Sequence, residues 1–133
     1  MPSRKSHQTL INLGRALERL EEAIHEPKRN KLVVDGTIQR FEFAIELFWK
    51  AFKRLLMEEG IETATPRESL QKAFQAGWFL DELLWIQMLR DRNESSHMYD
   101  QATAKHIYNR IKKYFPEMKQ TYLLLKDRAK IKG

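Results

Sequence analysis

The sequence contains no cysteine. Disulfides, thiolate metal ligands and cysteine nucleophiles are therefore excluded, and cysteine usage carries no mark of the redox compartment. The chain also lacks any apolar run long enough for a secretory signal peptide or for a helix that spans a bilayer. We therefore expect a cytoplasmic protein with no membrane contact.

Two further classes of site are missing from the sequence. Neither a glycine-rich phosphate loop nor the paired-aspartate motif of nucleotidyltransferases is present. His7, His25 and His106 do not have the spacing of metal ligands. We therefore expect neither a metal nor a cofactor, and we expect that the chain is not itself a nucleotidyltransferase.

The composition is that of a soluble globular protein. The chain has 133 residues, of which 42% are hydrophobic, which is enough to bury a core without metals or disulfides. Internal repeats and low-complexity tracts are absent from the sequence. We predict a single domain over residues 1–133, with its core at about residues 7–127.

The net charge of +6 is unevenly distributed. Residues 105–133 contain nine lysines and arginines against two acids, whereas the preceding part contains 15 basic and 16 acidic residues. Such a basic segment attracts phosphates. A solvated helix face has the same composition, and we favour that interpretation.

Apolar residues recur along the chain in alternating steps of three and four, which is the spacing of one face of an α-helix. The first two stripes are Leu10, Leu13, Leu17, Leu20 and Ile24, then Ile38, Phe41, Ile45, Phe48, Phe52 and Leu55. A short third helix up to Gly77 is followed by two further stripes, Phe79, Leu83 and Ile86, then Ile107, Ile111, Phe115, Met118, Tyr122 and Leu125. No alternating strand pattern competes with these helices. We predict an all-α fold, an antiparallel four- to five-helix up-and-down bundle, with the aromatic-rich second helix at its centre.

Several residues mark the expected helix ends. Gly60 is a stop signal for the second helix. Thr65 can cap the third helix, with Pro66 at its first position and Glu68 reaching back to the cap. Pro116 should kink the fifth helix or restart it, because proline removes a backbone donor and crowds the preceding turn.

The stretch RDRNESSHMYD, residues 90–100, concentrates chemically active side chains where the fourth helix gives way to turn-forming residues. On an unbroken helix Arg92 and His97 would point about 140° apart. The two side chains need a break in the helix to converge, which Ser95 and Ser96 favour, or they converge only with a second copy across a dimer axis.

The stretch offers the groups needed for metal-independent RNA cleavage. Arg92 presents a planar fork of donors that matches phosphate oxygens. His97 titrates near neutrality and can exchange a proton with a ribose hydroxyl or a leaving oxygen. Tyr99 adds a hydroxyl that can accept a transferred group or anchor the turn.

Each of these residues also has a purely structural interpretation. His97 can bond a nearby carbonyl, and Arg92 can form a salt bridge to Asp91 or Glu94. Asn93 can cap the turn. A buried tyrosine that packs the end of the fourth helix would look the same in sequence as a functional tyrosine.

At these residues the sequence resembles the HEPN domains, and most closely the HepT-like proteins, also called nucleotidyltransferase substrate-binding proteins. Their signature is an arginine followed by asparagine or aspartate, then histidine five residues after the arginine and tyrosine two later, as in Arg92, Asn93, His97 and Tyr99. A second segment that resembles the family carries Phe41, Glu42, Glu46, Leu47, Trp49 and Lys50. The likeness extends from the first helix to about Leu125.

This resemblance implies a homodimeric helical bundle that acts with a separately encoded minimal nucleotidyltransferase. It implies a ribonuclease toxin in which Arg92 binds the scissile phosphate and His97 is the acid or base. The partner would neutralise this toxin by transferring AMP to Tyr99. An alternative implied by the family is a non-catalytic subunit that binds nucleotide or presents substrate to the transferase.

Glu42 and Glu46 lie four residues apart on one helical face. Either can hold Arg92 or His97 in place, and we take both as supporting residues, with Asn93. Pairing with Lys50, or simple solvation, is the alternative.

Overall fold

The structure, a computed structural model, describes residues 4–95 and 100–129 and contains five helices in these residues. In chain order they are α1 (Arg4–Ile24), α2 (Lys31–Glu58), α3 (Pro66–Gln75), α4 (Glu82–Ser95) and α5 (Gln101–Arg128). The described residues contain no strand. The predicted all-α bundle is confirmed.

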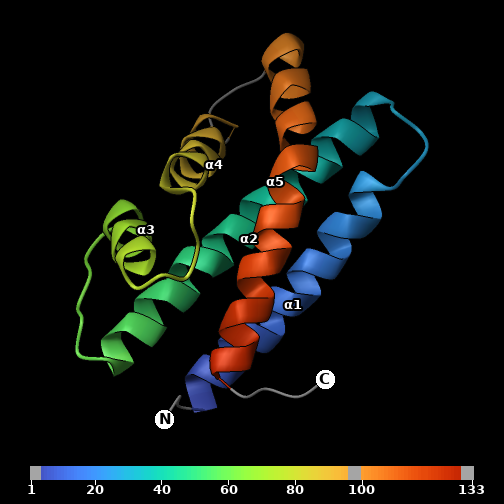
Figure 1. The fold of residues 1–133 in the computed structure, drawn as a ribbon. Helices are drawn as coiled ribbons and strands as arrows, with labels where there is room; N and C mark the ends of the chain where they lie inside the picture. Colours follow the sequence, from blue (N-terminus) through green and yellow to red (C-terminus); the bar gives the residue numbers. More distant parts are fainter. Residues whose placement is uncertain (1–3, 96–99, 130–133) are drawn as a thin grey trace.

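Helix α2 is the centre of the bundle, as its aromatic content predicted. It contacts each of the other four helices. In Figure 1 α1 and α2 run alongside each other and α5 crosses in front of α2, while the short helices α3 and α4 lie together on one side of α2. The second half of α2 is therefore covered by α3 and α4 on one side and by α1 on the other.

An aromatic cluster joins α2 to α4. Phe48 and Phe52 of α2 are fully buried, and their ring centres lie 5.0 Å and 5.5 Å from that of Trp85 on α4. Phe79, in the segment that precedes α4, stacks on Trp85 at 4.8 Å and lies 5.7 Å from Phe52. This packing places α4, and hence the motif at its end, against α2.

The helix ends follow the chemistry of their capping residues. Thr65 accepts a hydrogen bond from the Glu68 backbone N–H at 3.1 Å, as predicted. The Glu68 carboxylate accepts from the N–H of Ala64, one residue before the predicted cap position. Gly60 and Gly77 follow α2 and α3 with φ of 82°, a conformation that glycine adopts without steric cost.

Two features of helix α5 add to what the sequence indicated. It begins at Gln101, earlier than its apolar stripe indicates, because Asp100 accepts a hydrogen bond from the Ala102 N–H at 3.1 Å and caps it. It continues through Pro116 to Arg128 as one helix, so the restart offered as one outcome of this proline does not occur. Within the part of the chain that the structure describes, no helix has the length and apolar character needed to cross a membrane.

Candidate functional site

The structure places only part of the Arg92–Tyr99 motif. Arg92 and Asn93 lie in the last turn of α4, which ends at Ser95. His97 and Tyr99 lie outside the described residues. The convergence of Arg92 with His97 therefore stays a prediction.

Arg92 is anchored to the central helix. Its guanidinium Nη2 donates to the Glu46 carboxylate on α2, and its Nη1 donates to the Asn93 side-chain oxygen at 3.0 Å. The second Glu46 oxygen lies 3.6 Å from the ammonium of Lys50. Glu46 thus makes both contacts that the sequence left open, one to the motif arginine and one to its neighbour on α2.

Glu42 makes the second link between α2 and the end of α4. The Ser95 hydroxyl lies 2.5 Å from Glu42 Oε2, to which it donates, and 3.1 Å from the backbone oxygen of Arg92. Both predicted supporting carboxylates therefore face the motif end of α4. They tie α4 to α2 at two successive turns of the central helix.

Sequence reasoning missed a buried network beside the motif. Asp91 is fully buried and accepts from Arg110 Nε and Nη2 at 2.8 Å each, from Gln87 Nε2 at 3.0 Å and from the Tyr114 hydroxyl at 2.5 Å. Four donors compensate for the desolvation of the carboxylate. Asp91 follows Trp85 in steps of three along the buried face of α4, and an acid in that position was the available signal.

The network also changes the acidity of its members. Burial, followed by the hydrogen bond to Asp91, raises the pKa of Tyr114 well above its usual range. The hydrogen bonds to Asp91 raise the pKa of Arg110 further. At neutral pH Tyr114 is therefore a neutral phenol and Arg110 a cation, and their hydrogen bonds to Asp91 secure the backbone directly before Arg92.

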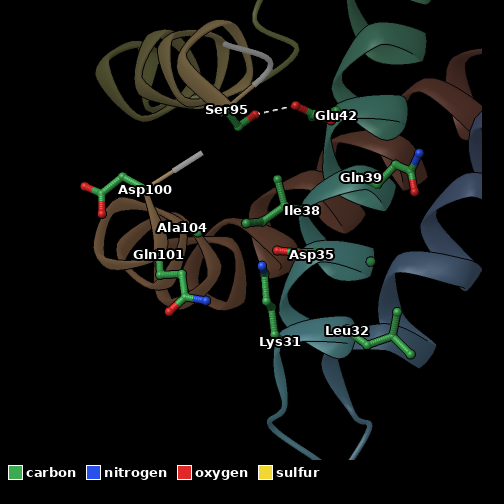
Figure 2. A pocket seen from close by; sticks show the side chains of 11 residues that line it. Lys31, Leu32, Asp35, Ile38, Gln39, Glu42, Ser95, Asp100, Gln101 and Ala104 are labelled. Carbon is green, nitrogen blue, oxygen red and sulfur yellow. Dashed lines mark hydrogen bonds between the residues drawn. The ribbon is translucent and has the colours of Figure 1, made fainter. Parts of the chain in front are cut away.

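A groove of about 510 Å³ lies beside the motif. It is bounded by the first half of α2, the end of α4 and the start of α5, and six of the residues that line it are Lys31, Asp35, Glu42, Ser95, Asp100 and Gln101. Figure 2 shows Lys31 and Asp35 directed into the space between α2 and α5. Since Ser95 and Asp100 flank residues 96–99, His97 and Tyr99 belong to a segment that starts and ends at this groove.

The start of α5 contributes a carboxylate to the same groove. Asp100 accepts from the Thr103 hydroxyl at 2.9 Å and from the Ala102 N–H at 3.1 Å. These two hydrogen bonds lower the pKa of Asp100. Asp100 is therefore an ionised helix cap at neutral pH. Among residues 4–95 and 100–129, no three histidine or acidic side chains are grouped so that they would hold a metal ion.

Comparison with known proteins identifies a family and several relatives that resemble this chain. The model of a family described as "Nucleotidyltransferase substrate binding protein like" matches residues 8–127. A Haemophilus influenzae protein named "Probable ribonuclease HepT" is 33% identical over 90 residues, which are 64% of this chain and 62% of that protein. The chain thus matches less than two thirds of the length of this curated relative.

Two solved structures share the fold. A protein from Thermus thermophilus has a TM-score of 0.80 and 32% sequence identity over 86% of this chain and 98% of its own. A Haemophilus influenzae protein, whose structure was reported to reveal the fold of a substrate binding domain of a nucleotidyltransferase, has a TM-score of 0.78 and 27% identity. That likeness covers 88% of this chain and 98% of the other.

Proposed function

The chain belongs to the family of nucleotidyltransferase substrate binding proteins, and from this premise we propose that it is the HEPN subunit of a two-component toxin–antitoxin system with a minimal nucleotidyltransferase. In this proposal the chain is the toxin, a ribonuclease that needs no metal. Its partner neutralises it by transferring AMP to Tyr99. We expect the pair to act in the cytoplasm.

One observation carries the proposal. The motif arginine is held by Glu46 at the end of α4, and the motif continues into a segment whose two flanks line a groove. A guanidinium fixed in this way retains donors for a phosphate, because a carboxylate and one amide oxygen do not use all five of its N–H groups. The arrangement suits a phosphodiester bound between Arg92 and His97.

The proposed reaction is a transesterification within the RNA strand. A ribose 2′-hydroxyl loses its proton and attacks the adjacent phosphate, and the 5′-oxygen of the next nucleotide leaves with a proton. A cyclic phosphate and a free 5′-hydroxyl result. His97 exchanges one of these protons, and Arg92 stabilises the charge that develops on the phosphate oxygens.

Dimerisation is part of the proposal. One histidine cannot be the base and the acid at the same moment, and a second copy across a twofold axis supplies the other imidazole. The outer face of α2 carries large exposed apolar side chains near the motif, with Phe43 57% and Leu32 81% exposed. Such residues favour burial against another copy.

The test is RNA cleavage by the purified chain in the presence of EDTA. We expect cleavage by the unaltered protein and a loss of at least about 100-fold in Arg92→Ala and in His97→Ala, in line with the usual contribution of an acid–base group. Circular dichroism and sedimentation should show both variants folded and associated as the unaltered protein is. Equal cleavage by the variants would remove these residues from the mechanism.

The second candidate is a non-catalytic subunit that binds nucleotide or substrate RNA for its transferase. The relative whose fold was reported as a substrate binding domain favours it, together with the groove beside the motif. It predicts no cleavage at any protein concentration, a stable complex with the transferase, and nucleotide binding that Arg92→Ala weakens. Incubation with the transferase and ATP, followed by mass spectrometry, separates the two, because only the first predicts an adenylyl adduct on Tyr99.

A further inference from the structure

A second groove, of about 420 Å³, lies over the second half of α2, away from the one beside the motif. Two polar residues of α1 line it together with residues of α2. Six of its lining residues matter here: Thr9, Asn12, Trp49, Lys50, Lys53 and Arg54. Leu47 and Met57 also line it, so its walls combine three cations and two polar side chains with apolar side chains and one large aromatic ring.

The charge of this groove has one sign. Three of its lining residues are cations, and no acidic residue lines it. Lys50 is partly neutralised by Glu46 at 3.6 Å. Lys53 lies over the Trp49 ring, 6.0 Å from its centre, and within the described chain neither Lys53 nor Arg54 forms an ion pair with a carboxylate. Two unneutralised cations on adjacent positions favour an anionic ligand.

The groove begins where the motif is anchored. Glu46 binds Arg92 with one oxygen and faces Lys50 with the other, so a single carboxylate stands between the motif arginine and the first cation of the groove. Arg54 lies two helical turns beyond Glu46 on α2, and eight residues correspond to about 12 Å along the helix axis. A chain of phosphates that lies on Arg92 is therefore within reach of the groove.

The polar groups of the groove match a sugar–phosphate strand. The Asn12 side chain accepts a hydrogen bond from Gln8 through its oxygen at 3.0 Å, which leaves its NH₂ donors for a ligand oxygen. The Trp49 side chain lines the groove as well and offers an aromatic surface beside these polar groups. Proteins that bind single-stranded nucleic acids combine cations with aromatic side chains, and in this groove an amide group lies beside them.

We propose that this groove binds the phosphate backbone of a single RNA strand, next to the nucleotides held at Arg92. This inference rests on the proposed function for the identity of its ligand, and it extends that function from the cleaved bond to the neighbouring nucleotides. Lys53 and Arg54 contact phosphates, and Asn12 contacts a phosphate or ribose oxygen. The groove therefore sets affinity for longer strands and takes no part in the chemical step.

The binding test uses a labelled single strand of about twelve nucleotides with 2′-O-methyl groups throughout, which cannot undergo the cleavage reaction. We expect Lys53→Gln/Arg54→Gln to bind it about 10-fold more weakly near 0.1 M salt and to lower the slope of log affinity against log salt by about 1.4, or about 0.7 for each lost phosphate contact. Lys50 is left unchanged because it touches Glu46. The matched control is Arg67→Gln/Lys72→Gln on α3, which removes the same charges and should change affinity less than about twofold.

The cleavage test separates this inference from the proposed function. For a long RNA we expect Lys53→Gln/Arg54→Gln to raise KM with kcat unchanged, and for a dinucleotide that spans only the scissile phosphate we expect no effect. If the chain cleaves RNA but this variant binds and cleaves as the unaltered protein does, or if the α3 control loses as much affinity, the groove inference is wrong. If no RNA is cleaved while the binding loss is confined to the groove variant, the proposed ribonuclease activity fails and the groove stands.

Discussion

The guanidinium of Arg92 on α4 forms an ion pair with the carboxylate of Glu46 on α2, 46 positions earlier in the chain. Both side chains are partly exposed, at 33% and 26%. A pair of this kind contributes little to folding, but it restricts where the arginine can point. The main effect of Glu46 is therefore to fix the position of the Arg92 guanidinium and not to stabilise the fold.

Glu46→Ala tests this positioning role. We expect the kcat of RNA cleavage to fall about 10-fold, because a freed guanidinium no longer meets the phosphate in one geometry. KM should stay the same or fall, since an acidic group is lost beside the RNA. Glu46→Gln should recover most of kcat, because its amide oxygen still accepts from Arg92.

Two further measurements complete this test, the free energy of unfolding of Glu46→Ala and the kcat of a variant that loses the same charge elsewhere. Glu46→Ala should change the free energy of unfolding by less than about 1 kcal/mol, as expected for a partly exposed pair. Glu22→Ala, which removes an exposed acid from α1, should leave kcat unchanged. Full activity of Glu46→Ala would mean that the ion pair does not position Arg92 for cleavage.

Asp91→Ala should be strongly destabilising. The substitution leaves Arg110, Gln87 and Tyr114 without the acceptor that they share, and breaking a buried ion pair typically costs about 3 kcal/mol or more. Urea denaturation followed by circular dichroism measures this loss. Arg90→Ala, at the neighbouring exposed position, is the control and should stay within about 0.5 kcal/mol of the unaltered protein. Similar midpoints for both variants would contradict a structural role for the network.

From the raised pKa of Tyr114 we predict that the folded protein loses stability at alkaline pH. Its pKa is raised by burial and by the hydrogen bond to Asp91, whereas in the unfolded chain a tyrosine ionises near pH ~10. Between these two values the folded protein binds one proton more than the unfolded chain, so the contribution of Tyr114 is complete below about pH 10 and declines as the pH rises further.

Tyr114→Phe isolates this contribution. The variant should be about 1 kcal/mol less stable than the unaltered protein at neutral pH, because it lacks the hydrogen bond to Asp91. The two free energies of unfolding should approach each other above about pH 10, since phenylalanine has no proton to lose. Chemical denaturation at a series of pH values measures both curves, and a constant difference between them would refute the assignment.

Two helical glycines should respond to alanine in opposite directions. A Cβ at Gly14 on α1 would lie 2.4 Å from the Tyr122 hydroxyl oxygen and 2.9 Å from Cζ of the same ring, so one of the two must move. A Cβ at Gly36 on α2 would meet nothing within 4 Å. We expect Gly14→Ala to destabilise the protein by about 1–2 kcal/mol and Gly36→Ala to stabilise it by up to about 1 kcal/mol.

A second background shows whether Tyr122 is the cause. In Tyr122→Ala the space beside Gly14 is open, and Gly14→Ala should then be neutral or stabilising, as alanine is elsewhere in a helix. The free energies of unfolding of the four proteins in this cycle measure the coupling. Equal effects of Gly14→Ala in both backgrounds would show that close approach of α1 and α5 does not require this glycine.

The local features of the fold were predictable because their causes lie within one helical turn. The apolar stripes of α1 and α2, the cap at Thr65 and the stop signals at Gly60 and Gly77 each depend on residues three to five positions apart. The sequence left more open at α5. Its early start depends on one side-chain hydrogen bond of Asp100, and its passage through Pro116 depends on packing along its whole length.

The candidate site also has a part that the sequence indicated and a part that it did not. Sequence indicated Arg92, Asn93, His97 and Tyr99 through their spacing, and it indicated that Glu42 and Glu46 share a helical face. It left open which of these carboxylates the arginine would meet. It offered Asp91 only as a salt-bridge partner of Arg92 and missed the buried network, because the partners Arg110 and Tyr114 come from another helix, 19 and 23 residues later.

The sequence by itself determined the helices, the charges and which side chains make up the motif, since these depend on residue type and on contacts within one turn. Only the tertiary structure decided that Glu46 pairs with Arg92, that Asp91 is buried against α5, and that the cations of α2 share a groove with Asn12 of α1. The physical reason is that such contacts depend on how helices are rotated and shifted against one another. That arrangement is set by the packing of the whole core and by no single segment.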